Sequence, residues 1–100
     1  MVDQKTRLNN PVGPVLEAGA AGRAVIAAIQ QLNQDVVIQD RGSYYRVLVP
    51  GRCRVTREAI EKTLGSSFQL PGDLELIMPA FKGLLSMSDQ EAVWRVGETP

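Results

Sequence analysis

The hydrophobic positions of the chain follow two spacings, one typical of helices and one typical of strands. Four aliphatic side chains recur at helical spacing: Val25, Ile26, Ile29 and Leu32. Together with interleaved alanines, they predict a helix over residues 20–32, and Asn33 is a residue type that often takes the left-handed conformation at a helix end. A second, shorter helix is predicted after Thr56, a good N-cap, and should end at Gly65.

The remaining apolar runs predict strands. Segments rich in β-branched, aromatic and alternating residues lie at 11–16, 36–38, 44–49, 52–55, 74–78, 84–87 and 92–96. The first contains Pro11 and Pro14, so an edge strand is expected there, because proline cannot donate to a ladder. Turns are expected around Asp40 and at Pro71, where glycine and polar residues cluster.

The order of these elements predicts the fold class. It runs strand, helix, strand, strand, and then repeats, and each half is too small to hold a core alone. We therefore expect one α+β domain of two packed βαββ halves over residues 11–96. The polar, aperiodic residues 1–10 predict a flexible N-terminal tail, and residues 97–100 a frayed C-terminus.

Composition narrows the possible partners and compartment. The 100 residues carry 11 Lys and Arg against 11 Asp and Glu, which gives no net attraction for nucleic acid. The apolar stretches are far shorter than the ~20 residues that cross a bilayer, so no membrane association is expected. The N-terminus lacks the apolar block of a signal peptide. A single cysteine, Cys53, cannot form an internal disulfide, and a cytoplasmic protein is predicted.

The sequence also lacks the residues that most catalytic sites need. There is no histidine, and one cysteine cannot build a thiolate metal site. No phosphate-binding glycine loop is present. The acidic pairs, such as Asp73 with Glu75, read more simply as solvated surface charge, and Cys53 as a small core residue. These absences predict an accessory protein without catalytic, metal-ligating or cofactor-binding residues, and not an enzyme.

Four ordered segments carry a resemblance to a known family. They are residues 9–15 (NNPVGPV), 38–47 (IQDRGSYYRV), 56–68 with Leu64-Gly65 before Phe68, and 74–83 with Ala80 to Gly83, closed by the strand of Trp94. The chain resembles the regulatory proteins, also called effector or coupling proteins, of soluble diiron bacterial multicomponent monooxygenases. The asparagine pair before Val-Gly-Pro is most similar to the toluene monooxygenase branch. Pro79-Ala80 departs from the residues common in the fourth segment.

The resemblance implies a role without a cofactor of the chain's own. Such proteins bind the hydroxylase component over the subunit that holds the diiron centre, and they tune oxygen activation, coupling and product selectivity. They are functionally linked to a reductase or ferredoxin. Hydroxylation of an aromatic hydrocarbon such as toluene or phenol is expected. A small ligand-binding or generic protein-interaction module of similar α+β fold remains the alternative.

Nine residues are candidates for docking on the hydroxylase: Asn9, Asn10, Val12, Gly13, Pro14, Arg23, Gln30, Asn33 and Tyr44. The first five lie in a segment that either orders on the partner or is a proline-fixed strand after a tail. The helix residues are either docking groups or an ordinary solvated face. Tyr44 suits an interface, where tyrosine is enriched, but it also follows a turn of structural character.

Overall fold

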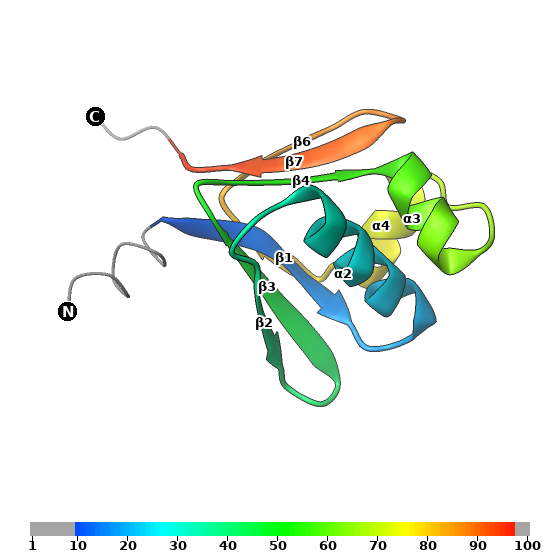
Figure 1. Ribbon diagram of the computed structural model, residues 1–100, viewed down its shortest axis with the longest axis horizontal. Helices are drawn as coiled ribbons and strands as arrows, with labels where there is room; N and C mark the ends of the chain where they lie inside the picture. The colour runs from blue at the N-terminus through cyan, green and yellow to red at the C-terminus, as the bar shows by residue number, and fades with distance from the viewer. Residues whose placement is uncertain (1–9, 98–100) are drawn as a thin grey trace.

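The computed structural model describes residues 10–97, and these form two antiparallel sheets and three helices (Figure 1). The elements are β1 (Pro11–Glu17), α2 (Ala20–Leu32), β2 (Val37–Asp40), β3 (Tyr44–Pro50), β4 (Arg52–Thr56), α3 (Arg57–Leu64), α4 (Gly72–Ile77), β5 (Ala80–Lys82), β6 (Leu84–Met87) and β7 (Glu91–Arg95). The larger sheet has the order β2-β3-β1-β5, and the smaller sheet has the order β4-β7-β6.

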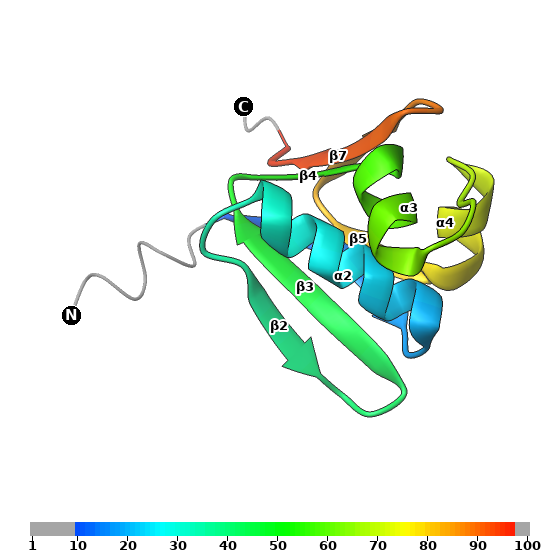
Figure 2. The ribbon, with the colours of Figure 1, turned by 45° about the vertical axis from the view of Figure 1, so that its right-hand side comes forward.

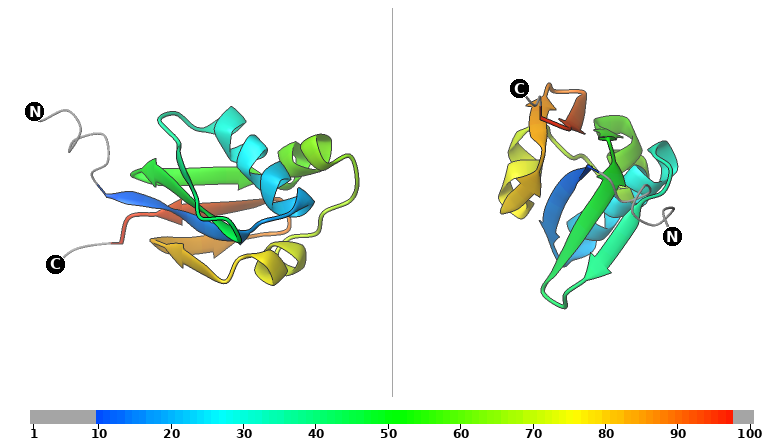
Figure 3. Two further views of the ribbon diagram at one scale, coloured as in Figure 1. Left: turned by 90° about the horizontal axis from the view of Figure 1, so that it is seen from below. Right: turned by 90° about the vertical axis from the view of Figure 1, so that its left-hand side faces the viewer.

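One hydrophobic core joins both sheets and the helices. It includes Leu16 of β1, Ile29 of α2, Ile60 of α3, Leu74 of α4 and Trp94 of β7, all of them fully buried. Helices α2 and α3 lie side by side (Figure 2), and Figure 3 shows α4 and β5 on the opposite side of β1 from β2. The α+β fold class is therefore confirmed, and neither half forms its core alone.

The sequence signals predicted the bounds of the two longer helices correctly. Helix α2 spans the predicted residues, and α3 begins after Thr56, whose Oγ1 accepts a hydrogen bond from the backbone N–H of Ala59 at 3.1 Å. Gly65 ends α3 in the left-handed conformation, with φ of 81°. The expectation for Asn33 was wrong, because its backbone is extended, with φ of −135°. Its side chain instead donates a hydrogen bond to a carbonyl oxygen in the last turn of α2.

The predicted edge position of β1 was wrong. This strand lies between β3 and β5, in the interior of the larger sheet. Its pairing with β3 runs from Pro11 to Val12 and resumes at Val15, so the ladder is interrupted at Gly13 and Pro14. Because Pro14 lies in that interruption, its missing N–H removes no bond to β3, and an interior strand tolerates the proline.

The strand predicted at residues 74–78 was also wrong, because Gly72–Ile77 form helix α4. Pro71 suits a helix start, and Asp73 and Glu75 in the first turn complement the helix dipole. The Asp73 carboxylate also accepts a hydrogen bond from the backbone N–H of Gln69 at 2.8 Å.

After α4 the chain forms β5, a strand that the sequence pattern did not predict. β5 pairs with β1 in the larger sheet, whereas the strands on either side of it in the second half belong to the smaller sheet. The second half thus contributes a strand to the sheet of the first. The domain bounds at 11 and 96 stay a prediction, and Asn9 and residues 98–100 lie outside the described residues.

Candidate functional site

The exposed face of α2 carries two of the predicted docking residues. Arg23 and Gln30 are both exposed, on a helix whose opposite face supplies Val25 and Ile29 to the core. A shallow depression of about 250 Å³ lies beside Arg23, between the start of α2 and the end of α3. Two long polar side chains are therefore available to a partner on this helix.

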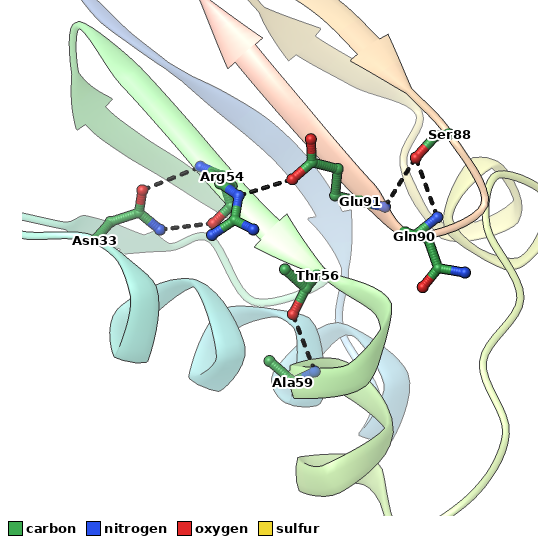
Figure 4. Close-up of polar contacts among 7 residues, drawn as sticks. All are labelled: Asn33, Arg54, Thr56, Ala59, Ser88, Gln90 and Glu91. Atoms are coloured by element: carbon green, nitrogen blue, oxygen red, sulfur yellow. Dashed lines mark hydrogen bonds and ion pairs between the residues drawn. The ribbon is translucent and has the colours of Figure 1, made fainter.

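Asn33 is placed differently, because its amide is used within the fold (Figure 4). Its Nδ2 donates to the carbonyl oxygen of Ile29 at 2.7 Å and to that of Arg54 at 2.8 Å. Its Oδ1 accepts from the backbone N–H of Arg54 at 3.0 Å. The side chain thereby satisfies a carbonyl at the end of α2 and fastens the helix to β4. Asn33, which the sequence analysis named as a docking candidate, therefore has a structural role in joining α2 to β4.

The β1 segment is mostly buried. Val12 is 2% exposed and packs in the core, while Pro14 is among the fully buried residues. At Gly13 a Cβ would lie 2.4 Å from the carbonyl oxygen of Val47, so only glycine allows β1 to approach β3 this closely. Asn10 is exposed and has a φ of 56° where the chain enters the strand. In this conformation Asn10 alone of these four offers a side chain to a partner.

Tyr44 lies at the rim of an open groove at the other end of β1. The groove has a volume of about 490 Å³, and its lining residues are Val15, Glu17, Ala18, Ser43, Tyr44 and Pro79. Tyr44 itself is 40% exposed, opposite Glu17 in the register of β1 and β3. A half-exposed tyrosine beside a hollow is a typical protein-contact group, since its ring gives a large area at a low entropic cost.

The acidic residues within the described part of the chain form no metal-binding group. Among residues 10–97 there is no cluster of three potential metal ligands, and no helix long and apolar enough to cross a membrane. Cys53 is fully buried, and desolvation raises the pKa of its thiol to about 12. The thiol is therefore protonated at neutral pH and packs as a small apolar group.

Among residues 10–97, Glu61 is the one carboxylate with a shifted pKa, and its hydrogen bonds hold the segment that follows α3. Its Oε2 accepts from the backbone N–H of Phe68 at 2.8 Å and from Nε of Arg57 at 3.1 Å. These bonds, that of Phe68 first, hold the pKa of the Glu61 carboxyl below its ordinary value of 4.5. The carboxylate thereby anchors the segment between α3 and α4, where the buried Phe68 enters the core.

This arrangement predicts a specific dependence of stability on pH. The folded-state pKa of Glu61 is depressed. The contribution of its hydrogen bonds to the unfolding free energy is therefore fully present above about pH 4.5, and it is lost as the pH falls through the folded-state pKa. The difference in unfolding free energy between wild type and Glu61→Gln should therefore be constant from pH 7 to about 5 and shrink below that. Urea titrations across this range measure it. Glu58→Gln, on the same helix, is the matched control, and identical profiles for both variants would contradict the assignment.

Comparisons with known proteins place this geometry in context. The family model described as MmoB/DmpM family matches residues 10–95. The effector subunit of the alkene monooxygenase system of Xanthobacter autotrophicus (strain ATCC BAA-1158 / Py2) is 44% identical over 87 residues, which cover 85% of each chain. A chain from the structure of a phenol hydroxylase–regulatory protein complex superposes with a TM-score of 0.76 at 17% identity, over 87% of this chain and 98% of that one. The last match bears on the fold alone.

Proposed function

The chain belongs to the MmoB/DmpM family, and from this we propose that it is the effector component of a multicomponent monooxygenase. In this role it has no active site or cofactor of its own and works in the cytoplasm. It binds the hydroxylase component, which holds the diiron centre. The observation that carries the proposal is the match to an effector subunit at 44% identity over 85% of both chains.

The effect on the hydroxylase is a shift between conformations. A protein that binds one conformation of its partner more tightly than another raises the population of that conformation by its differential affinity alone. Bound near the metal centre, the effector thereby changes oxygen activation and the fraction of electrons from the reductase or ferredoxin that end in product. It needs no chemistry of its own for this, which fits a chain whose one thiol is buried and protonated.

The docking residues that we propose are the exposed members of the predicted set, which lie at separate places: Arg23 and Gln30 on α2, Asn10 before β1, and Tyr44 beside the groove at the far end of β1. The buried Val12, Gly13 and Pro14 shape the β1 strand that runs between Asn10 and the groove of Tyr44, and Asn33 fixes the end of α2. Asn9, which lies outside the described residues, stays a docking candidate from the sequence.

The substrate is proposed as a small unsaturated hydrocarbon. The 44%-identical relative is named for an alkene monooxygenase system, and the sequence itself resembles the toluene monooxygenase branch. Toluene and propene are therefore the two substrates to compare in a reconstituted system.

Binding to the hydroxylase tests the docking surface. In isothermal titration, wild type should bind the hydroxylase encoded with it, and Tyr44→Ala should raise Kd roughly fivefold or more, as truncation of an interface tyrosine commonly does. Lys62→Ala, an exposed side chain on α3, is the matched control and should leave Kd unchanged. An unaltered Kd for Tyr44→Ala would remove the groove from the docking surface, and no binding by wild type would overturn the proposed function.

A further inference from the structure

The smaller sheet has one face turned away from the core, and that face is rich in arginine. In the β4-β7-β6 register, Arg52 lies opposite Arg95, which lies opposite Leu84. The next outward-facing row along the sheet is Arg54, Val93 and Ser86. The core-facing rows between them contain Cys53, Trp94 and Leu85. We call the surface of Arg52, Arg54, Arg95 and Leu84 the arginine face.

Nothing in the described part of the chain covers this face. The helices lie on the other side of the smaller sheet in Figures 1 and 2, and Arg52 and Arg95 are both exposed. Leu84 is 49% exposed, next to Arg95 across the ladder. Val93 lies in the same outward-facing row as Arg54 and Ser86 and is 7% exposed.

The charges on this face are not balanced within the fold. Arg54 is paired, with its Nε 2.7 Å from Oε1 of Glu91 (Figure 4). Among residues 10–97, by contrast, no carboxylate lies within 4 Å of Arg52 or Arg95. Two like charges directly opposite each other on neighbouring strands are unfavourable. The chain as a whole carries no net charge, so this positive excess is local.

We propose that the arginine face binds an acidic surface of a protein partner, and that this partner is the hydroxylase. The identity of the partner rests on the proposed function, and this contact is separate from that of Arg23 and Gln30, because α2 lies on the other side of the smaller sheet. Each guanidinium group can donate two parallel hydrogen bonds to one carboxylate, and such a contact relieves the repulsion between Arg52 and Arg95. Arginine beside an exposed aliphatic side chain is also the composition of a protein-contact surface.

The same features argue against a nucleic acid on this face. Proteins that bind duplexes through phosphates make several such contacts, commonly 6–10. Within residues 10–97, the arginine face offers two guanidinium groups without a carboxylate partner, beside the exposed Leu84 of the edge strand β6. A carboxylate-bearing protein surface matches this charge and area better than a phosphate backbone does.

Arg52→Glu separates a binding role from a structural one. It replaces a repulsive cross-strand pair by an attractive one, so the melting temperature should rise by about 1 to 6 °C. The same change should raise Kd for the hydroxylase about tenfold or more at 50 mM NaCl. Wild-type affinity should fall as salt increases to 500 mM, and the salt dependence of the variant should be weaker. Stability and affinity then move in opposite directions, which loss of folding cannot produce.

Two control variants make the result specific. Lys62→Glu reverses one exposed charge on α3, and Arg52→Gln removes the Arg52 charge without reversing it. The first should leave Kd unchanged, and the second should weaken binding less than Arg52→Glu does.

The contradicting results are distinct from failure of the proposed function. If wild type binds the hydroxylase and Arg52→Glu and Arg95→Glu bind equally well, the arginine face is not the contact. If instead those variants lose binding to a 20-base-pair DNA duplex while hydroxylase affinity is unchanged, the face serves a nucleic acid and the proposal is wrong. If wild type does not bind the hydroxylase, both the proposed function and this inference fall.

Discussion

Gly13→Ala is expected to destabilise the protein by about 3 kcal/mol or more, enough to unfold a large fraction of a domain of ordinary stability. A Cβ at this position would lie 2.4 Å from the carbonyl oxygen of Val47, and the φ of 147° is one that residues with side chains rarely adopt. The obstruction is backbone in the neighbouring strand, so no rotamer change relieves it. Urea denaturation at pH 7 measures the change.

A matched glycine separates the steric effect from the conformational one. Gly42 also has a positive φ, of 87°, but a Cβ there meets nothing within 4 Å. Gly42→Ala should therefore cost only about 1 kcal/mol, the usual penalty for a left-handed alanine. If both substitutions had the same small effect, the close approach of β1 to β3 would be wrong, and Gly13 would again be open to a direct role in docking.

Trp94→Ala should be comparably damaging, at about 3–5 kcal/mol, because truncation of a fully buried tryptophan leaves a large cavity. Trp94 is 0% exposed and pairs with Cys53 of β4 and Leu85 of β6, so it holds the smaller sheet against the rest of the core. The loss can be followed by urea denaturation monitored by circular dichroism, since the substitution removes the only tryptophan of the chain.

Trp94→Phe gives the control for this second prediction. The indole Nε1 is buried without a hydrogen-bond partner in the described structure, so the substitution by phenylalanine removes no hydrogen bond. Its cost should be well below that of Trp94→Ala and come from lost volume alone. Equal losses for the two variants would mean that the indole N–H has a partner, such as a buried water, that contributes to stability.

Signals that act within a few residues were readable from the sequence. The start of α3 at Thr56 and its end at Gly65 depend on local capping, and both were predicted. The helical spacing in α2 and the turn around Asp40, which joins β2 to β3, are equally local signals. A short apolar run was not decisive, since Leu74 to Met78 suits a strand as well as a buried helical turn. Pro71 and the acidic first turn resolve it in favour of α4.

Properties that depend on distant partners were not readable. The interior position of β1 follows from its pairing with β5, and no pattern within residues 11–17 contains that information. The role of Asn33 depends on Arg54, which approaches it only in the folded chain. The arginine face likewise depends on the register of β4 and β7, which places Arg52 opposite Arg95.

The docking candidates also differ in whether their exposure could be predicted from nearby residues. Residue type and position on a helix indicated that Arg23 and Gln30 would be exposed, and they are. The segment Val12 to Pro14 was assigned to docking through resemblance, whereas its burial depends on the packing of β1 against its sheet neighbours and against β4 and β7 of the smaller sheet. The proposal therefore assigns contact to exposed side chains and assigns the shape of β1 to the buried ones.

The most direct test of the effector role is a titration of the chain into its hydroxylase and electron-transfer components under steady-state turnover. Product formation and NADH consumption are measured together, with toluene and with propene. The account predicts no product from the chain alone, and a rate and a product-to-NADH ratio that rise with its concentration and saturate. A flat response in both quantities at concentrations where binding is saturated would contradict it.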